Sequence, residues 1–386
     1  MQARCLIKNA HLVSPGLDLI GAAIEIVDGR IHAIYAEDQT LPEVSTTYDA
    51  KGEIVAPGFI DIHTHGAAGH DLCDATPETL PAFAKAKLKE GVTTFLPTTL
   101  TVKEDALEQS FRAATHYFEN QTYAKVPGIH VEGPFINPNC TGAQNPEYVR
   151  PPNLAEIQKL NSIVPVKIVS LAVEMPDGIE LTRALTQQGI ITSLAHTAAT
   201  FEQFTAAKKA GATHLTHFCN QMTPLHHREI GLVGAGLLDD SIRIEMICDG
   251  IHLCPEMIQL AFKVATEERI MMITDSIAAS GLSDNQRTRL GELEVIIQDG
   301  VARLESGALA GSTLKLNVAL QNIQRFTGRP LHDLIRTTSL NQAESLQMAD
   351  LGKIEPGYKA DLVVLDRDFQ PKAVFVDGIE RLANLD

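Results

Sequence analysis

The sequence predicts an α/β protein, a (β/α)8 barrel of the TIM type with a small β domain built from both ends of the chain. Three observations predict this fold. The middle of the chain carries eight short apolar runs, most of them separated by helical segments, and eight β/α units close a barrel. Both ends are rich in strand-like runs. A chain of 386 residues also has room for a barrel of about 250 residues and an appendage.

The two ends of the chain share a strand-rich pattern. Residues 22–38 hold two β-type runs on either side of Asp28-Gly29, and residues 360–378 hold two apolar runs that finish on another Asp-Gly pair. Asp-Gly between such runs is a strong hairpin signal. We therefore expect residues 1–54 and 350–386 to form one small β domain, and residues 55–349 to form the barrel.

The apolar runs of the middle region are the predicted barrel strands. They alternate with helices whose ends are marked: Thr76-Pro77 opens one helix and Gly91 closes it, and Thr200 and Gly211 bracket another, as caps and terminal glycines do. The eight runs lie at residues 54–65, 92–100, 128–135, 166–174, 190–197, 213–218, 242–250 and 270–276.

An irregular region follows the eighth run. Residues 291–307 resemble an inserted hairpin that turns at Asp299-Gly300, and helical stretches are expected at residues 313–326 and 331–348. Residues 102–118, earlier in the chain, also have helical apolar spacing.

The composition argues against nucleic-acid and membrane functions. The formal net charge is −16, tryptophan is absent and aromatic residues make up 5%, so neither phosphate-backbone binding nor a base-stacking platform is expected. No uninterrupted apolar stretch is long enough for a membrane span, and no signal peptide is recognised. The six cysteines form no C-x-x-C pair, which favours a reducing, cytoplasmic location.

Polar, metal-competent residues stand at the ends of several predicted strands. His63 and His65 end the first run, and residues two apart in a strand point to the same side. Because the carboxyl ends of barrel strands meet at one face, where active sites lie, these side chains are expected to converge. The strand-end residues are His63, His65, Glu132, His196, His217 and Asp275.

The types of these residues indicate a divalent metal. Imidazole with carboxylate suits zinc best, with iron, manganese and cobalt as alternatives, and Glu132 could be shared between two ions. Such a site leaves a position for water and lowers the pKa of that water towards ~7. Asp275 has two interpretations: it caps a turn beside Ser276, or it acts as the general base that carries a proton from water to the leaving amine.

Seven segments carry a more specific signal. They are PGFIDIHTHG, HVEGPF, SLAHT, THFCNQMTPLHHREIG, CDGIHL, ITDSIAASG and LAGSTL. Together they resemble one family, the N-acetylglucosamine-6-phosphate deacetylases of the amidohydrolase superfamily. The H-x-H pair alone would indicate only the superfamily, whereas E-G-P-F with H-H-R-E and A-G-S is far more selective. The resemblance runs in order through most of the chain and includes its β-rich ends.

The resemblance implies a metal-bearing (β/α)8 barrel with a small β-sandwich domain from both termini, usually in a homodimer. It implies that Glu132, His196 and His217 are the main metal ligands. His63 and His65 fall on a second-site pair that some members lack, so one or two metals are open. Asp275 matches the catalytic aspartate.

The same resemblance assigns the substrate contacts. His252 matches a residue that helps to polarise the acetyl carbonyl, and Arg228 matches the phosphate-binding arginine. Independently of the resemblance, a guanidinium suits bidentate phosphate binding; the alternative interpretation of His226-His227-Arg228 is a solvated surface loop. The other sugar-phosphate contacts are Ala143, Gln144, Asn220, Gln221, Leu309, Ala310 and Gly311.

One departure concerns Gln144. The family usually has histidine there, a residue taken to contact a sugar hydroxyl, and glutamine hydrogen-bonds but carries no charge. Gln221, where the family has alanine, is a second departure. These changes leave the identity of the sugar more open than the type of reaction.

Other histidines receive structural interpretations. His214 lies three residues before His217 and should therefore point to the opposite side of the strand. His130 lies two residues before Glu132 and could support it from behind. His70 could form the rim of the pocket.

The sequence thus predicts an enzyme that deacetylates N-acetylglucosamine 6-phosphate to glucosamine 6-phosphate and acetate. The same chemistry on N-acetylgalactosamine 6-phosphate is the nearest alternative. A cyclic-amide hydrolase would commonly use a carbamylated lysine where Glu132 stands. A non-catalytic scaffold with this fold would have no need of the aligned polar strand ends.

Overall fold

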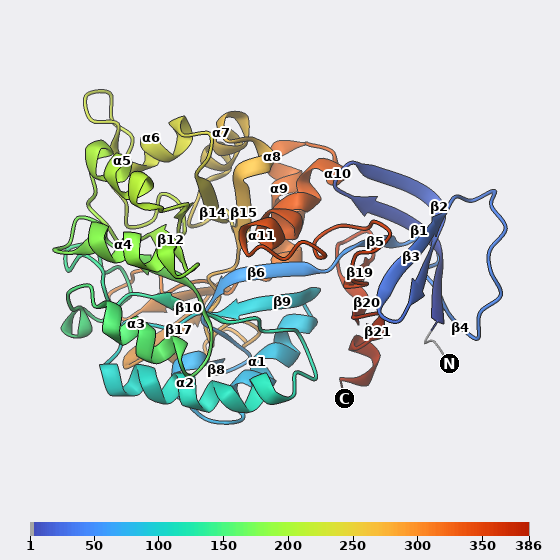
Figure 1. The fold of residues 1–386 in the computed structure, drawn as a ribbon, viewed down its shortest axis with the longest axis horizontal. Helices are drawn as coiled ribbons and strands as arrows, with labels where there is room; N and C mark the ends of the chain where they lie inside the picture. Colours follow the sequence, from blue (N-terminus) through green and yellow to red (C-terminus); the bar gives the residue numbers. More distant parts are fainter. Residues whose placement is uncertain (1–3, 386) are drawn as a thin grey trace.

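The computed structural model describes residues 4–385, and its strands fall into a mixed sheet built from both chain ends and a set of parallel strands from the middle (Figure 1). The mixed sheet has eight strands in the order β21-β20-β19-β5-β1-β2-β3, with β4 also paired to β1. Its strands are β1 Arg4–Ser14, β2 Leu17–Val27, β3 Arg30–Tyr35, β4 Thr46–Asp49, β5 Ile54–Pro57, β19 Leu362–Leu365, β20 Pro371–Val376 and β21 Ile379–Glu380.

The two chain ends join where β19 pairs antiparallel with β5, with Leu362 opposite Pro57 and Leu365 opposite Ile54. Alternation along these strands points one set of side chains inward. The buried side chains of this sheet form a separate apolar cluster, which includes Ile7, Leu12, Ile24, Leu362 and Phe375.

The predicted Asp-Gly turns are confirmed. Asp28 and Gly29 have φ of 49° and 77° and join β2 to β3, and Asp299 and Gly300 have φ of 52° and 73° and join two further strands. Both central residues of a type I′ turn need positive φ, which glycine adopts freely and aspartate tolerates.

Each of the eight predicted runs of the middle region contains a parallel strand, but the first run, residues 54–65, is divided. Its first half, β5, belongs to the terminal sheet, and only its second half, β6, is a strand of the middle region. Strands β10 to β15 form one parallel sheet in chain order, and β6 pairs parallel with β9. They are β6 Phe59–Thr64, β9 Val92–Pro97, β10 Ile129–Glu132, β11 Val166–Leu171, β12 Ile191–Leu194, β13 His214–Leu215, β14 Arg243–Ile247 and β15 Ile270–Ile273.

Backbone contacts link these two groups of parallel strands. A parallel bridge between Thr98 and His130 connects the end of β9 to β10. At the other end of the series β15 lies beside β6, and the Asp275 N–H donates to the His63 carbonyl at 2.9 Å. The first and last of the eight strands are therefore neighbours.

Helices follow most of the parallel strands and pack around them (Figure 1). The predicted ends of α5 are confirmed: Thr200 and Gln203 form a capping box, and Gly211 ends the helix at φ 115°. The helices are α1 Thr79–Leu88, α2 Glu104–Glu119, α3 Leu154–Asn161, α4 Gly178–Gln187, α5 Phe201–Ala210, α6 Gly231–Leu238, α7 Pro255–Val264, α8 Thr266–Arg269, α9 Leu316–Thr327, α10 Leu331–Leu334 and α11 Leu340–Ser345.

Short elements complete the chain. They are the two-stranded β7 Gly66–Ala67 and β8 His70–Asp71, the three-stranded sheet of β16 Arg287–Leu290, β17 Leu293–Gln298 and β18 Val301–Leu304, and the 3-10 turns η1 Leu72–Asp74, η2 Pro146–Tyr148, η3 Ile335–Thr338 and η4 Leu382–Asn384.

Two expectations about these regions need correction. The hairpin at residues 291–307 has a third strand, β16, because residues 287–290 pair with β17. The stretch 331–348 is not one helix but α10, η3 and α11. The hydroxyls of Thr338 and Ser339 both donate to the Ile335 carbonyl, at 2.8 and 3.0 Å, and such back-bonding competes with a regular helical ladder.

Candidate metal centre and cavity

The polar residues predicted at strand ends do come together at the carboxyl ends of the parallel strands. His63 lies in β6 and Glu132 ends β10, while His196, His217 and Asp275 follow β12, β13 and β15. The last three have positive φ values of 45°, 32° and 50°. Non-glycine residues rarely adopt this region, and such strain gathers at functional sites.

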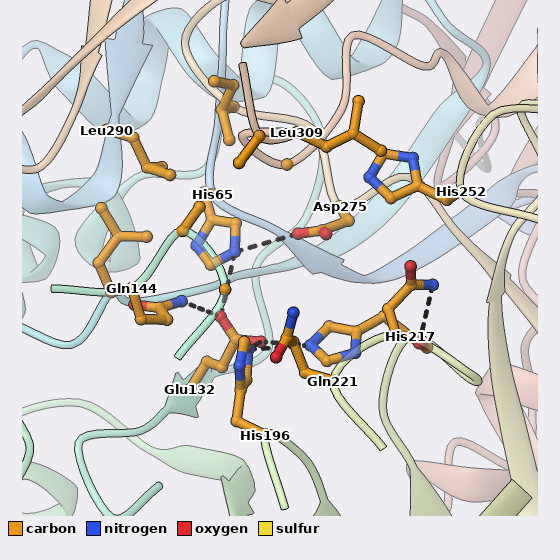
Figure 2. Close-up of a pocket in the computed structure, with 17 residues that line it drawn as sticks. His65, Glu132, Gln144, His196, His217, Gln221, His252, Asp275, Leu290 and Leu309 are labelled. Atoms are coloured by element: carbon orange, nitrogen blue, oxygen red, sulfur yellow. Dashed lines mark hydrogen bonds and ion pairs between the residues drawn. The ribbon is translucent and has the colours of Figure 1, made fainter. Parts of the chain in front are cut away.

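The six residues form two contiguous groups, His63 with His65 and Asp275, and Glu132 with His196 and His217. In each group the ligand atoms lie within 4.8 Å of one another, and every member is buried. Glu132 lies between the groups, because its Oε1 is 3.0 Å from Nε2 of His217 and its Oε2 is 3.4 Å from Nε2 of His65 (Figure 2).

The spacing of the histidines fits a shared cation. The Nε2 atoms of His196 and His217 are 3.1 Å apart, and those of His63 and His65 are 3.4 Å apart. Metal–nitrogen bonds of about 2.0–2.1 Å in a tetrahedral site separate two ligands by roughly 3.3–3.4 Å. The donor set therefore fits a divalent ion such as zinc.

The other ring nitrogens show which tautomer two of these histidines adopt. Nδ1 of His196 lies 2.7 Å from the Cys140 carbonyl, and Nδ1 of His65 lies 3.2 Å from the Thr98 carbonyl. A carbonyl only accepts, so Nδ1 carries the proton in both rings and Nε2 keeps its lone pair for a ligand.

Strong electrostatic coupling holds the two carboxylates in the charged form. Burial alone would raise the pKa of Glu132 and of Asp275, but the neighbouring histidines hold the pKa of both carboxyls well below the ordinary range. Burial would lower the pKa of His65, yet Asp275 and Glu132 raise it to about 9. A bound cation would take the place of these protons, since metal binding releases protons from its ligands.

A cavity of about 290 Å³ opens above this centre. Figure 2 shows Glu132, His196 and His217 on one side of it, and Leu290 and Leu309 from the β16–β18 region on the other. Among its lining residues are His65, Ala143, Gln144, Asn220, Gln221, His252, Asp275 and Gly311.

His252 is held in this cavity by Asp249. Oδ2 of Asp249 lies 2.6 Å from Nδ1 of His252. Burial would lower the pKa of His252, but the Asp249 carboxylate raises it. Asp249 contacts Nδ1, so Nε2 of His252 is not engaged by this carboxylate.

Gly311 allows the backbone to approach Asp275 closely. Its φ is +51°, and a Cβ at this position would lie 2.5 Å from Ile277 Cγ2 and 2.9 Å from the Asp275 carbonyl oxygen. That carbonyl accepts from the Ser312 N–H at 2.8 Å. Any side chain here would displace the strand end that carries Asp275.

Three of the sequence-predicted residues do not line the cavity. His63 is fully buried below it. Ala310 is fully buried too, and its N–H donates to the Ala302 carbonyl within the hairpin. Arg228 lies in an exposed loop, where its guanidinium contacts Nε2 of His227 at 2.6 Å. The phosphate-binding role of Arg228 stays a prediction.

Gln144 is held by the protein at both ends of its amide. Its Nε2 donates to Oε2 of Glu132 at 2.5 Å (Figure 2). Its Oε1 accepts from the Thr101 N–H at 2.7 Å. The side chain is 7% exposed and still lines the cavity. Gln144 therefore contacts the central carboxylate of the metal-competent groups, a connection that its position in the sequence did not indicate.

Among the remaining histidines, the prediction for His214 is confirmed, and the suggestion that His70 forms the rim of this pocket is wrong. His214 points away from His217, into the helix layer, where its Nε2 lies 2.6 Å from the Ser345 hydroxyl. His130 lies behind the centre, with its ring centroid 4.7 Å from that of His63. His70 lines a different cavity.

Two buried polar groups near the centre were missed by sequence reasoning. Glu245 lies within β14, 3.4 Å from His63. Lys87 in α1 pairs with Asp61 and Glu90 at 3.0 and 2.7 Å, and all three are buried. A charged residue inside an otherwise apolar run was the signal available for Glu245 and Asp61.

The comparisons with known proteins agree with this geometry. The family profile described as the amidohydrolase family matches residues 54–380. An N-acetylgalactosamine-6-phosphate deacetylase of Escherichia coli O157:H7 is 38% identical over 92% of this chain and 93% of its own length. An N-acetylglucosamine-6-phosphate deacetylase of Lysinibacillus sphaericus is 36% identical over 82% of this chain and 83% of its own.

A solved structure is similar over almost the whole chain. It is a mutant N-acetyl-D-glucosamine-6-phosphate deacetylase from Mycobacterium smegmatis in complex with N-acetyl-D-glucosamine-6-phosphate. The TM-score is 0.91 at 29% identity, covering 98% of this chain and 100% of that one. The chain therefore belongs to the amidohydrolase family, within its N-acetylglucosamine-6-phosphate deacetylase group.

Proposed function

We propose that this protein hydrolyses the acetamide of N-acetylglucosamine 6-phosphate, releasing glucosamine 6-phosphate and acetate. The observation that carries the proposal is the buried group of Glu132, His196 and His217, with Asp275 beside it, at the floor of an open cavity. The N-acetylglucosamine-6-phosphate deacetylase of Lysinibacillus sphaericus, 36% identical over 83% of its own length, supports the choice of substrate.

In this proposal Glu132, His196 and His217 hold the main divalent cation. His63, His65 and Asp275 offer a place for a second. Zinc suits this imidazole and carboxylate set best, with iron, manganese or cobalt as alternatives. A divalent ion in such a site supplies Lewis acidity, which activates water and polarises a carbonyl.

Asp275 is the general base of the proposed reaction. It is ionised, because His63 and His65 hold its pKa low. It accepts a proton from the attacking water and returns that proton to the amide nitrogen as the C–N bond breaks. An unprotonated amide anion would be a very poor leaving group, so both transfers are required.

His252 assists from the opposite wall of the cavity. In its doubly protonated form, which the Asp249 carboxylate favours by raising the pKa of His252, the ring directs Nδ1–H to Asp249 and donates Nε2–H to the acetyl oxygen, stabilising the negative charge that develops there. We assign sugar and phosphate contacts to Ala143, Gln144, Asn220, Gln221, Arg228, Leu309, Ala310 and Gly311.

We also propose the family architecture: a closed (β/α)8 barrel that begins with β6 and extends to residue 349, and a small β-sandwich domain from residues 4–57 and 350–385. The expected boundary at residue 54 moves to residue 57 because β5 Ile54–Pro57 pairs within the terminal sheet. The neighbouring positions of β6 and β15, and the separate apolar cluster of the terminal sheet, support this division. A homodimer in the cytoplasm is part of the same proposal. None of the described helices is both long and apolar enough to span a bilayer.

A second substrate has a specific observation in its favour. The relative that acts on the galactosamine epimer is 38% identical over 92% of this chain, and Gln144 stands where the family usually has histidine. N-acetylgalactosamine 6-phosphate is therefore the alternative substrate for the same reaction.

The test measures acetate release from both epimeric sugar phosphates and from unphosphorylated N-acetylglucosamine, with metal content determined on the same sample. We expect release from the glucosamine compound to be fastest, and weak activity without phosphate. Asp275→Asn should lower kcat by about 10²–10⁴-fold, the usual contribution of a general base. Metal-loaded protein that releases acetate from neither sugar phosphate would refute the proposed function.

A further inference from the structure

Glu245 is a buried carboxylate that the proposed reaction does not use. It lies in the middle of β14, is 0% exposed, and neither of its side-chain oxygens has a hydrogen-bond partner among the described residues. Nδ1 of His63 lies 3.4 Å from Oε2, and within the described part of the chain this nitrogen has no other polar partner. This approach of His63 is therefore the one polar contact of the Glu245 side chain among those residues.

Leaving a carboxylate in this state is costly. An ionised carboxylate without partners loses its hydration on burial, and a protein keeps such a group only where something compensates for it. The other buried carboxylates nearby are paired, as Asp61 is with Lys87. Glu245 differs because, among the described residues, the only ionisable side chain paired with it is the imidazole of His63.

The opposite edge of the His63 ring faces the metal-competent residues. Its Nε2 lies 3.4 Å from Nε2 of His65, 3.4 Å from Oδ1 of Asp275 and 3.5 Å from Oε1 of Glu132. The ring thus stands between Glu245 on one side and the proposed ligands on the other.

We propose that Glu245 is a positioning residue for the metal centre, acting through His63. It accepts the Nδ1–H of His63, which leaves the Nε2 lone pair directed at the ligand group and prevents the ring from adopting the other tautomer. Carboxylate–histidine–metal arrangements of this kind orient the imidazole and make it a better ligand. This inference rests on the proposed metal-dependent function.

The neighbouring ligands show why His63 is a special case. His65 and His196 direct Nδ1 to backbone carbonyls, which are neutral acceptors. A carboxylate is a stronger acceptor for an N–H, so it increases the basicity of the imidazole more. Glu245 therefore strengthens metal binding at the group of His63, His65 and Asp275 in particular.

The test compares zinc binding and stability in two matched variants. Glu245→Gln removes the charge and keeps the shape. Glu25→Gln makes the same change at a carboxylate that is also buried, at 1% exposure, but has partners in Arg4 and Tyr35. Zinc affinity is measured by competition with a chromophoric chelator, and the melting temperature is measured on metal-free protein.

We expect Glu245→Gln to weaken zinc binding at the more weakly bound site by about 10–100-fold, the usual effect of losing such a partner, and to leave the melting temperature of metal-free protein unchanged or higher. Glu25→Gln should do the reverse, lowering the melting temperature and leaving zinc affinity unchanged. In a His63→Ala background, Glu245→Gln should have no further effect on zinc affinity, because it acts through that ring.

Wild-type zinc affinity in Glu245→Gln would overturn the inference, as would an additional loss in the His63→Ala background. A lower melting temperature of the metal-free variant with unchanged zinc binding would assign Glu245 a purely structural role and would also overturn it. None of these readouts involves a substrate. A failure of acetate release in wild-type protein would therefore count against the proposed reaction and not against the role of Glu245.

Discussion

Lys87→Met is the change that most directly tests the role of the buried charges below the candidate metal centre. Lys87 is fully buried, with Nζ 3.0 Å from Oδ2 of Asp61 and 2.7 Å from Oε2 of Glu90. Methionine fills a similar volume but removes the positive charge. The variant leaves two carboxylates buried close together with no cation between them.

The expected loss is large because both carboxylates are buried, Asp61 at 0% and Glu90 at 3% exposure. Removing one member of a buried ion pair typically costs about 3–5 kcal/mol. With an unfolding entropy of roughly 2.1 cal/mol/K per residue, a chain of 386 residues should lose about 4–6 °C in melting temperature. Asp61 also accepts from Thr274, through its hydroxyl at 2.6 Å, so the strand end that carries Asp275 should loosen as well.

The assay is thermal unfolding of metal-loaded protein, followed by circular dichroism. Adding Glu90→Gln to Lys87→Met should recover part of the loss, because it removes one of the two unpaired charges. Arg112→Met is the matched control: that side chain is 65% exposed in its pair with Glu108, and exposed pairs contribute at most about 1 kcal/mol. A melting temperature for Lys87→Met within 1 °C of wild type would refute the reasoning.

Three further predictions follow from the site and its surroundings. Gln144→His should change the ratio of kcat/KM between the two epimeric sugar phosphates, since only histidine can carry charge against a hydroxyl or phosphate; an unchanged ratio would show that this position does not read the sugar. Removal of metal with a chelator should abolish acetate release. It should also lower the melting temperature by about 5 °C if the ion was present at 1,000 times its Kd, and added zinc should restore both properties. Unchanged activity and melting temperature in the chelator would contradict a metal at this site. Burial would raise the pKa of Asp239, but Lys208 and Ser241 hold it at about 2, below the ordinary value, so its stabilising effect is present above pH ~4 and is lost as pH falls towards 2. Asp239→Asn should therefore lower stability to urea more at pH 6 than at pH 3, and equal losses at the two pH values would contradict this assignment.

Much of the fold was predictable because its signals are local. The eight parallel strands are short apolar runs with marked boundaries, and the Asp-Gly turns need positive φ at both central residues. The predictions were wrong where weak local preferences compete with tertiary contacts. Side-chain hydroxyls near Ser339 bond back to Ile335 and divide a stretch that reads as one helix, and β16 is a strand only because β17 pairs with it.

The candidate site divides in the same way. Residues that end a predicted strand could be grouped from sequence, since the carboxyl ends of parallel strands share one face, and the structure brings Glu132, His196 and His217 within 4.8 Å. Gln144 was recognised as a departure from the family pattern, but its hydrogen bond to Glu132 links residues from different segments. Arg228 is exposed in a loop, and nothing local to that loop shows where its guanidinium acts.

The sequence by itself determined the family, the strand ends that carry metal-competent residues and the type of reaction, because the motifs of this family are short segments that fall at strand ends. Only the tertiary structure decided what lies behind those residues. The 3.4 Å approach of Glu245 to His63 joins β14 to β6, and the pairing of Lys87 with Asp61 joins α1 to β6. Burial and facing direction depend on how distant segments pack, and no local pattern in the sequence specifies that arrangement.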